Sequence, residues 1–492
     1  MLRLPYAGRS AAGICFIGSF FIRPNTVILA VKIQKTMKKI LQIGAGKSTS
    51  YLIKYLSDFV RQGEIGYTIV DKNLDLARKI VGDTPGIDMT TVDIFDDEKR
   101  QALIRDHDLI ISMLPARLHM VVAKDALKYG KHLVTASYIS DEMKALDDEV
   151  KAKGLVFMNE IGLDPGIDHM SAMRTIDRIK AQGGEMLHFE SFTGGLVAPE
   201  SDNNLWHYKF TWNPRNVVLA GQGGVSKFLH EGEYKYIPYH RLFRRTEFLE
   251  IDGYGRFEAY PNRDSLKYQK IYGLENVRTL YRGTIRRVGF SRAWNVFVQL
   301  GMTDDSYVME NSENMTKRDF VNAFLPYSPN DSVELKLRYY MKIDQDDELW
   351  LKLEELDLFN PHEKIGLKNA TPAQMLQKIL EEKWTLEPDD KDMIVMYHKF
   401  GYRLGDENKQ IDASLVVIGE NQIYTAMAKT VGLPLGIAAM KILRGEITKP
   451  GVQLPVAKDI YEPVLKELEQ YGIVFNEKEV PFSSYNPDFT LG

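Results

Sequence analysis

A phenol and a carboxylate in two separate segments of the chain could carry out proton transfer. Tyr138 follows the apolar run of residues 133–136, and Asp164 follows a second apolar run, residues 155–159. Polar side chains at the carboxyl ends of strands in an open α/β sheet face the ligand crevice. There, a phenol and a carboxylate can give and take protons while a hydride moves. The alternative interpretation is that Tyr138 is a packed aromatic ring and Asp164 a helix cap.

A glycine-bearing turn lies about one Rossmann domain's length before this carboxylate, with the sequence Gly44-Ala45-Gly46-Lys47-Ser48-Thr49. The first glycine permits a tight turn, and the second lets a pyrophosphate approach the backbone at a helix N-terminus. Thr49 stands where a third glycine is usual, so the motif is imperfect. We predict that a dinucleotide binds here through Gly44, Gly46, Lys47 and Ser48. The alternatives are a purely structural turn and a Rossmann domain that has lost its ligand.

The end of the next predicted strand bears on the choice between NAD and NADP. Asp71 ends that strand, where a carboxylate can accept both ribose hydroxyls and would repel a 2′-phosphate. Lys72 is adjacent and could reverse the preference by reaching that phosphate. Asp71 therefore favours NAD, and Lys72 leaves NADP open. Two pairs at later strand ends are predicted to flank the adenine and nicotinamide sides: Asp93-Ile94 and Leu114-Pro115.

Residues 38–159 alternate between short apolar runs and segments of helical spacing. The predicted strands are residues 39–43, 67–71, 89–94, 109–114, 133–136 and 155–159. The predicted helices are residues 48–60, 74–81, 96–105, 118–129 and 141–153. Strands alternating with helices of this length predict a parallel sheet with right-handed crossovers.

After Gly166 the pattern changes to a helix, residues 169–181, followed by short strand-like runs. Those runs are residues 187–192, 257–260, 279–285 and 295–299, which indicate an antiparallel or mixed sheet. Residues 305–390 contain many acidic residues and are predicted to form a small helical subdomain. Its predicted helices are residues 319–324, 349–356 and 372–383. Strand character returns at 392–399 and 415–418. A buried helix is predicted at 424–443, interrupted by Gly432 and Pro434.

The fold class predicted from these patterns is α/β: a Rossmann-type parallel-sheet domain plus an α+β substrate and dimerisation domain that carries a small helical insertion. The expected organisation is an extension at 1–36, the dinucleotide domain at 37–165, the substrate domain at 166–304 and the helical subdomain at 305–391. Residues 392–492 are expected to return to the substrate and Rossmann domains.

Composition limits the classes of function. A chain of 492 residues with 44% hydrophobic and 26% charged residues is that of a globular protein of about two to four domains. The formal net charge of −4 gives no basic surface for nucleic acid. Cys15 is the only cysteine, which excludes a disulfide framework and fits a reducing compartment. No metal site is expected, because Asp168-His169 are adjacent rather than spaced as ligands on one face.

The first 36 residues allow two interpretations. Arg3 and Arg9 precede an apolar run at 14–22, which loosely imitates a signal peptide. Arg23 and Pro24 interrupt that run, and no small-residue cleavage site follows. We favour an over-extended reading frame that begins before Met37, and a targeting segment is the alternative. No run reaches the 18 or more apolar residues of a membrane span, so no membrane partner is expected.

Several long motifs in fixed order resemble those of the saccharopine reductases, the glutamate-forming saccharopine dehydrogenases. The resemblance spans roughly residues 38–475. The motifs are residues 135–140, 158–169, 194–196, 198–201, 208–212, 259–265, 282–286, 398–400 and 424–428. They are far more specific than the glycine turn alone.

The resemblance implies a reaction of lysine metabolism, in which 2-aminoadipate 6-semialdehyde and L-glutamate condense and the imine is reduced by NADPH to saccharopine. The family's proton-transfer residues carry over to Tyr138 and Asp164. Its substrate contacts carry over to Ser137, Tyr138, Asp164, Gly166, Arg263, Thr284 and Arg286. The resemblance also implies amino-acid partners, a homodimer and a cytoplasmic location.

Two departures from the family pattern affect these expectations. Family members carry a cysteine before the Gly-Gly-Leu segment, where this chain has Thr193, a poor proton shuttle near neutral pH. The family's basic residue after the second strand is an arginine, where this chain has Lys72, which puts the NADP preference in doubt. One alternative is a related imine-reducing dehydrogenase of polyamine precursors, of the carboxynorspermidine or homospermidine type. The other is a non-catalytic nucleotide-binding protein.

Overall fold

A seven-stranded parallel sheet forms the first half of the structure, a computed structural model that describes residues 37–483 and 490–491. Its strand order is β15-β6-β5-β4-β1-β2-β3, and every neighbouring pair is parallel. The strands are β1 (Lys38–Ile43), β2 (Ile65–Asp71), β3 (Ile87–Thr91), β4 (Leu109–Ser112), β5 (His132–Thr135), β6 (Val156–Met158) and β15 (Gly451–Gln453). Six of these strands coincide with predicted ones, and β15 was not predicted.

Helices cover both faces of this sheet, because successive side chains of each strand point to opposite sides. Ile40 packs in the core under one set of helices, and Leu41 packs in the core under the other. The first set is α1 (Ser50–Arg61), α2 (Asp75–Val81) and α15 (Ala426–Leu443). The second is α3 (Asp97–Arg105), α4 (His119–Tyr129), α5 (Asp141–Lys144) and α6 (Asp147–Ala152). Short 3-10 turns, η1 (Lys47–Thr49) and η2 (Ala116–Leu118), precede α1 and α4.

Helix α15 comes from late in the chain and packs directly on α1. A Cβ added at Gly432 would lie 2.8 Å from the Leu52 nitrogen, so glycine allows the two helices to approach closely. The predicted interruption of this helix is wrong, because α15 runs continuously through Pro434. By length and composition α15 could also cross a membrane, but 83% of it is buried inside the protein, as expected of a core helix.

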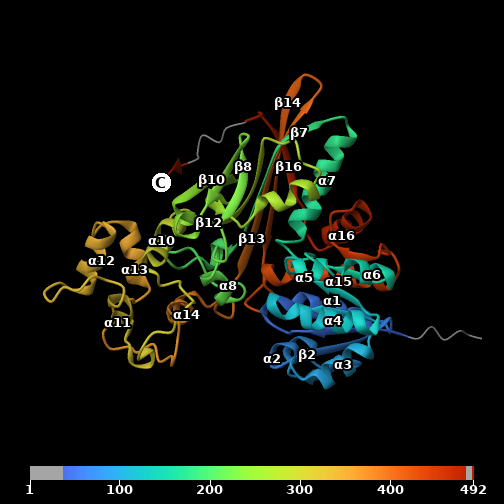
Figure 1. Ribbon diagram of the computed structural model, residues 1–492, viewed down its shortest axis with the longest axis horizontal. Helices are drawn as coiled ribbons and strands as arrows, with labels where there is room; N and C mark the ends of the chain where they lie inside the picture. The colour runs from blue at the N-terminus through green and yellow to red at the C-terminus, as the bar shows by residue number, and fades with distance from the viewer. Residues whose placement is uncertain (1–36, 484–489, 492) are drawn as a thin grey trace, which may run out of the picture. The chain divides into compact units, whose positions relative to one another are not determined.

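A ten-stranded mixed sheet forms the second half (Figure 1). Its order is β16-β14-β13-β7-β12-β11-β10-β17, with β8 paired to β12 and β9 paired to β8. Its strands are β7 (Glu185–Val197), β8 (Ser226–His230), β9 (Glu233–Ile237), β10 (Arg245–Ile251), β11 (Gly255–Pro261), β12 (Thr279–Arg287), β13 (Asp392–Leu404), β14 (Glu407–Ile418), β16 (Asn476–Val480) and β17 (Thr490–Leu491). Among the described residues, β7 and β12 are the one parallel pair of this sheet.

Two long helices cover one face of the mixed sheet. They are α7 (Ile167–Ala181) and α16 (Lys458–Gln470), which pack together beside β7 and β13 (Figure 1). Short helical pieces join the strands elsewhere: η3 (Pro199–Ser201), α8 (Pro214–Val218), η4 (Tyr239–Arg244), η5 (Ser265–Lys267) and α9 (Tyr268–Ile271).

The predicted strand at 295–299 is wrong, because this segment lies inside helix α10 (Phe290–Leu300). The run Val296-Phe297-Val298 resembles a buried strand when read alone. Phe290, Trp294 and Phe297, however, are spaced three and four residues apart and form one buried helical face. Glycines with positive φ angles flank the helix at 289 and 301 and define its ends.

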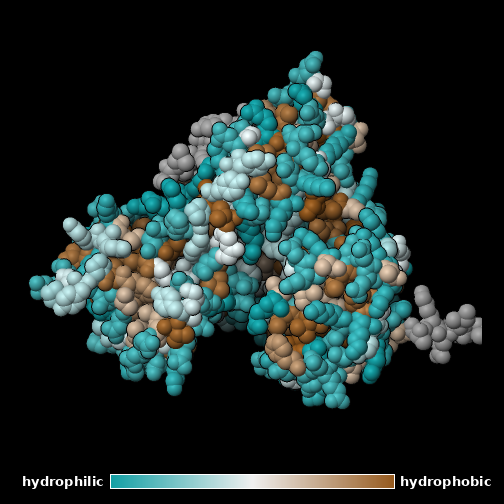
Figure 2. Space-filling view, viewed as in Figure 1, coloured by the Kyte–Doolittle hydropathy of each residue, from teal (hydrophilic) through white to brown (hydrophobic). Residues whose placement is uncertain are grey.

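The helical insertion continues from α10 and packs on the same aromatic core. Its elements are η6 (Ser312–Asn314), α11 (Lys317–Asn322), α12 (Val333–Met341), α13 (Glu348–Glu355) and α14 (Pro372–Trp384). In that core the Trp384 ring contacts Trp206 edge-on and Trp294 at a tilt. Figure 2 shows a hollow on this face of the protein, between the insertion and the parallel-sheet domain.

Candidate active site

The glycine turn is built from main-chain geometry. Gly44 has a φ of 106°, and a Cβ there would lie 2.8 Å from the Met113 carbonyl oxygen, so only glycine fits. Gly46 is exposed at the start of η1, and a Cβ there would meet nothing within 4 Å. The Thr49 hydroxyl donates to the Gly46 carbonyl at 2.7 Å, which closes the turn where a third glycine is usual. Lys47 is exposed and Ser48 half-buried at the start of this helical turn.

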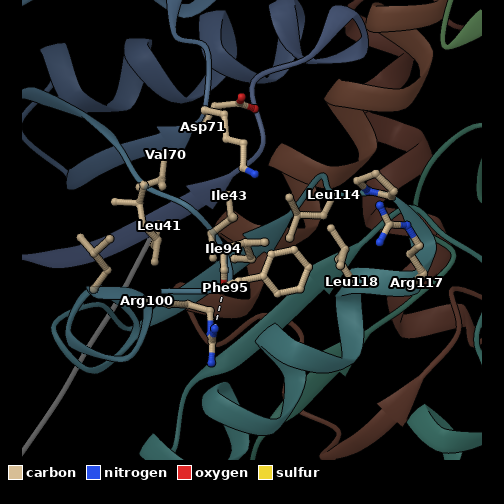
Figure 3. A pocket seen from close by; sticks show the side chains of 14 residues that line it. Leu41, Ile43, Val70, Asp71, Ile94, Phe95, Arg100, Leu114, Arg117 and Leu118 are labelled. Atoms are coloured by element: carbon tan, nitrogen blue, oxygen red, sulfur yellow. Dashed lines mark hydrogen bonds between the residues drawn. The ribbon is translucent and has the colours of Figure 1, made fainter. Parts of the chain in front are cut away.

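A cavity of about 290 Å³ lies beside the turn, at the ends of β1 to β4 (Figure 3). Five of its lining residues were predicted to bind the cofactor: Asp71, Lys72, Ile94, Leu114 and Pro115. The other five predicted residues do not line it: Gly44, Gly46, Lys47 and Ser48 form the turn, and Asp93 lies 3.2 Å from the Lys72 ammonium group. In Figure 3 the Phe95 ring lies between Ile94 and Leu118, which gives the cavity an apolar wall suited to a planar base.

The Asp71 carboxylate is engaged by the protein backbone. The Ala45 N–H donates to one oxygen at 2.6 Å, and the Asn73 N–H donates to the other at 2.9 Å. Asp71 therefore ties the end of β2 to the glycine turn and has fewer lone pairs for ribose hydroxyls. Lys72 and Arg117 are exposed cations on the same cavity, and Arg117 was missed by sequence reasoning. These two side chains can hold a phosphate there.

Tyr138 and Asp164 lie together, although 26 residues separate them. The Tyr138 hydroxyl donates to an Asp164 oxygen at 2.9 Å, and the two residues belong to the loops after β5 and β6. The loop that carries Asp164 folds back tightly on itself at Gly166: its φ is 147°, and a Cβ would lie 2.1 Å from the Gly162 carbonyl oxygen. Burial raises the pKa of the Tyr138 phenol, and the Asp164 charge raises it further. Burial also raises the pKa of Asp164.

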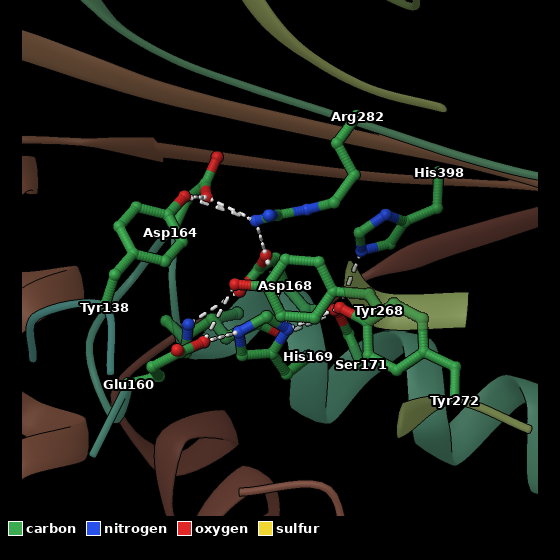
Figure 4. Close-up of polar contacts among 12 residues, drawn as sticks. Tyr138, Glu160, Asp164, Asp168, His169, Ser171, Tyr268, Tyr272, Arg282 and His398 are labelled. Carbon is green, nitrogen blue, oxygen red and sulfur yellow. Dashed lines mark hydrogen bonds and ion pairs between the residues drawn. The ribbon is translucent and has the colours of Figure 1, made fainter. Parts of the chain in front are cut away.

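Arg282, on β12, completes this pair and was not predicted as a site residue. Its Nη2 donates to Asp164 at 2.7 Å and to Asp168 at 2.5 Å, so Arg282 lies between the two carboxylates (Figure 4). Its guanidinium group also stacks 4.5 Å from the centre of the Tyr268 ring. A sequence signal did exist, because Arg282 alternates with two other predicted contacts on one strand and therefore shares their face.

A second buried group of polar side chains lies beneath the pair (Figure 4). Glu160 accepts hydrogen bonds from the Tyr268 hydroxyl at 3.0 Å and the Ile139 N–H at 2.9 Å, and its carboxylate lies 2.8 Å from His169 Nε2. His169 Nδ1 lies 2.5 Å from the Tyr272 hydroxyl. Burial opposes ionisation of Glu160, but His169 and these donors hold the pKa of Glu160 below its ordinary value. Sequence reasoning singled out neither Glu160 nor this role for His169.

Arg263 and Ser137 lie at the margins of the Tyr138–Asp164 pair. The Arg263 guanidinium group is 5.1 Å from the centre of the Tyr138 ring, at a residue with a φ of 53° in the loop after β11. The Ser137 hydroxyl lies 2.7 Å from His119 Nε2, and His119 Nδ1 lies 2.8 Å from the Ser112 hydroxyl. Burial lowers the pKa of His119 to about 4, so this missed residue is a neutral link between the ends of β4 and β5.

Thr284 and Arg286 lie on the same face of β12 as Arg282. Thr284 pairs with Thr193 of β7, whose buried hydroxyl has no hydrogen-bond partner among the described residues. The Arg286 guanidinium group lies 5.1 Å from the Tyr208 ring and 5.3 Å from the Phe290 ring. Its Nε is also buried without a hydrogen-bond partner in the described part of the chain. Such donors suit a carboxylate brought by a ligand.

Within residues 37–483, no group of three or more histidine, cysteine, aspartate and glutamate side chains is arranged to hold a metal ion. The buried His169 instead lies between Glu160 and Tyr272.

A parallel sheet with a glycine turn, joined to a mixed sheet that supplies arginines to a half-buried tyrosine–aspartate pair, defines a dinucleotide-binding protein of the dehydrogenase type. Two family models match the chain: the saccharopine dehydrogenase NADP binding domain at residues 40–158, and the saccharopine dehydrogenase C-terminal domain at 162–473. The chain belongs to the saccharopine dehydrogenase family. The predicted family and fold class are thereby confirmed.

Individual relatives fall into two groups. The chain is 36% identical to the rat mitochondrial alpha-aminoadipic semialdehyde synthase, over 90% of this chain and 48% of that protein. It thus spans about half the length of these mammalian relatives. It is 32% identical to the saccharopine dehydrogenase [NADP(+), L-glutamate-forming] of Schizosaccharomyces pombe, over 90% of this chain and 99% of that one.

A solved structure gives the same result. The apo saccharopine dehydrogenase (L-Glu forming) of Saccharomyces cerevisiae superimposes with a TM-score of 0.80 and 31% identity, covering 90% of this chain and 100% of that one.

Proposed function

We propose that this protein interconverts saccharopine with 2-aminoadipate 6-semialdehyde and L-glutamate, using NADP. The observation that carries the proposal is the Tyr138–Asp164 contact beside Arg282 and Arg263, in a chain aligned over 99% of a fungal relative named for this activity. A nicotinamide cofactor supplies or accepts the hydride when bound. The protein's own residues then handle protons and carboxylates.

Proton transfer is assigned to Tyr138 and Asp164. As the glutamate amino group attacks the aldehyde carbon, the new C–N bond forms and the amine proton passes to the Asp164 carboxylate. Asp164 passes this proton through the Tyr138 O–H to the aldehyde oxygen, which becomes a hydroxyl. The second amine proton then follows through the same carboxylate, and the hydroxyl leaves as water as its C–O bond breaks and the C=N bond forms. Because burial raises the pKa of Asp164, this carboxyl group can hold that proton between the two steps.

The substrate carboxylates are assigned to the arginines around this pair. Arg263 lies over the Tyr138 ring, and Arg286 presents a buried Nε that lacks a partner among the described residues. Arginine binds carboxylates in a planar, bidentate way, and saccharopine has three of them. Smaller polar contacts are assigned to Ser137, Gly166 and Thr284.

The cavity beside the glycine turn fits a dinucleotide. In the glycine turn, the tight bend at Gly44 and the open main chain at Gly46 leave room for a pyrophosphate, with Lys47 and Ser48 beside it. Asp93 and Ile94 are assigned to the adenine side, and Leu114 and Pro115 to the nicotinamide side. NADP is favoured over NAD because backbone N–H groups occupy Asp71, whereas Lys72 and Arg117 are exposed on the cavity.

A homodimer and a cytoplasmic location are also part of the proposal. Support for both is the family resemblance, together with a chain whose single cysteine fits a reducing compartment. Light scattering of the purified protein would test the first, with a monomer mass as the contradicting result. A fluorescent fusion of the full chain would test the second, and fluorescence confined to an organelle would contradict it.

The test of activity is oxidation of NADPH and NADH, measured side by side with the semialdehyde and glutamate. Oxidation that requires both substrates is expected, and faster oxidation of NADPH would assign the cofactor. No oxidation, in protein shown to bind nucleotide, would contradict the proposal. Polyamine-type amines would then be the next substrates to measure, followed by the non-catalytic alternative.

A further inference from the structure

Asp164 and Asp168 share one nitrogen of one arginine. Arg282 Nη2 carries two hydrogens; one points to Asp164 Oδ1 at 2.7 Å and the other to Asp168 Oδ2 at 2.5 Å. The arginine side chain is 3% exposed, so its charge is balanced by these carboxylates rather than by water. A single buried cation therefore lies between two acids.

The surroundings of the two carboxylates differ. Asp168 is 1% exposed, lies in the first turn of α7, and accepts the Gly166 N–H at 2.6 Å. A helix N-terminus and a main-chain donor both stabilise a negative charge. The Asp164 side chain is 14% exposed and instead receives the Tyr138 O–H. Asp164 is thus the carboxylate that borders the reacting atoms.

The direction of the pKa shifts agrees with this asymmetry. Burial opposes ionisation of Asp168, but His169 and Arg282 hold the pKa of Asp168 below its ordinary value. Burial raises the pKa of Asp164; Arg282 opposes that rise, and the Asp168 charge adds to it. Two acids on one arginine with opposite shifts indicate two different roles.

Every charged or titratable neighbour of Asp164 fits this division. Arg282 approaches from β12, Tyr138 from the loop after β5, and Asp168 with His169 from α7. Tyr272, after α9, interacts electrostatically with Asp164 and is bonded to His169. Arg263 lies 5.1 Å from the centre of the Tyr138 ring. Of these groups, Arg282 is the cation in direct contact with Asp164.

We infer that Asp168 is a positioning residue, the permanent counter-ion of Arg282, whose charge keeps Asp164 able to take up and release a proton during the reaction. The inference rests on the proposed function. Without Asp168, the whole positive charge of Arg282 would act on Asp164. Asp164 would then remain ionised at the pH where it must hold a proton.

The test is the pH dependence of kcat/KM in the Asp168→Asn variant. Asparagine keeps the size of the side chain and an acceptor for the Gly166 N–H, but removes the charge. Loss of a nearby negative charge favours ionised Asp164 and so lowers the pKa of Asp164. The limb of the pH profile that reports ionisation of Asp164 should therefore move to lower pH by about one unit. An unmoved limb with a uniformly lower rate would reduce Asp168 to a structural role and overturn the inference.

The Asp177→Asn variant is the matched control. Asp177 lies on the same helix, is half-buried, and accepts a hydrogen bond from Tyr461 at 2.6 Å, away from Arg282. Its pH profile should equal that of the wild type. An equal shift in both variants would contradict the inference.

A second variant tests the opposite sign. Arg282→Gln removes the cation, so the pKa of Asp164 should rise and the same limb should move to higher pH. Shifts in the same direction in Asp168→Asn and Arg282→Gln would overturn the inference. If Asp168→Asn does not fold, the Arg282→Gln shift alone decides, because an unmoved limb contradicts the pairing.

Failure of the proposed function can be told apart from failure of this inference. If the wild-type protein does not turn over the semialdehyde with glutamate, the proposed function fails. Carbon NMR of carboxyl-labelled aspartate, with the Asp164 signal assigned through Asp164→Asn, then titrates Asp164 directly. A lower midpoint in Asp168→Asn supports the pairing, and an equal midpoint overturns it.

Discussion

The glycine turn and the Arg282 cluster are built in opposite ways. The turn uses six consecutive residues, and its key atoms belong to the main chain at Gly44 and Gly46. The cluster uses side chains from segments up to 144 residues apart, such as the Tyr138 hydroxyl and Arg282. The turn is partly exposed, whereas Arg282 and Asp168 at the centre of the cluster are buried. A larger side chain would therefore disrupt the turn. Removal of a charged or proton-donating group would instead disrupt the cluster.

The largest effect should come from removing a proton-transfer group in the cluster. Asp164→Asn and Tyr138→Phe should each lower kcat by about 10²–10⁴-fold, because general acid–base catalysis contributes that much. The dissociation constant for NADPH, measured by fluorescence, should stay within about twofold. Tyr461→Phe, at another tyrosine–aspartate hydrogen bond, is the control and should keep wild-type turnover. Wild-type rates in both site variants would remove the catalytic assignment.

The next effect should appear in the turn. In Gly44→Ala, the new Cβ would meet the Met113 carbonyl oxygen at 2.8 Å, at a φ that alanine rarely adopts. We expect the free energy of unfolding to fall by about 1–3 kcal/mol and NADPH to bind at least about tenfold more weakly. Gly46→Ala is the matched control for stability, because a Cβ there meets nothing within 4 Å. Equal thermal stability in the two variants would contradict this account of the turn.

A substrate contact of the cluster should have a smaller effect. Arg263→Ala should raise KM for the amino-acid substrate by about tenfold, because a bidentate arginine–carboxylate contact is lost. Steady-state kinetics with saturating NADPH would measure it. Arg278→Ala, at an exposed arginine on the chain before β12, should leave KM unchanged. An unchanged KM in the Arg263 variant would make that arginine structural.

The smallest effect should concern the exposed rim of the cofactor cavity. Lys72→Ala should lower the ratio of kcat/KM for NADPH over NADH by about fivefold, since an exposed charged contact contributes about 1 kcal/mol. Lys79→Ala, at an exposed lysine of α2, should keep the ratio. If the Lys72→Ala variant keeps the wild-type ratio, binding of the 2′-phosphate would be assigned to Arg117 alone.

The difference between the glycine turn and the Arg282 cluster also explains which parts of the structure could be predicted from the sequence. Strand–helix alternation and the glycine turn depend on neighbouring residues, so the parallel sheet and the predicted lining of the cavity could be read from local patterns. Tyr138 and Asp164 were found because each follows a strand. Arg282 was missed although it alternates with Thr284 and Arg286 on one strand, because its partners Asp164 and Asp168 come from a distant segment and no local pattern joins them to it.

Two errors in the fold have the same origin. Val296-Phe297-Val298 reads as a strand until the aromatic core around Trp294 is known. The three residues of β15 are too few to show a period, and they form a strand only because β6 provides an edge.

The position of α15 and β15 in the chain has a consequence for biosynthesis. The seventh strand and the helix on α1 emerge from the ribosome about 300 residues after the first six strands. Until then, the Leu52 and Tyr55 surface that Gly432 and Gly436 cover is bare, and nascent chains are open to chaperone capture. Translation of the mixed-sheet half must therefore be nearly finished before the parallel-sheet half is complete.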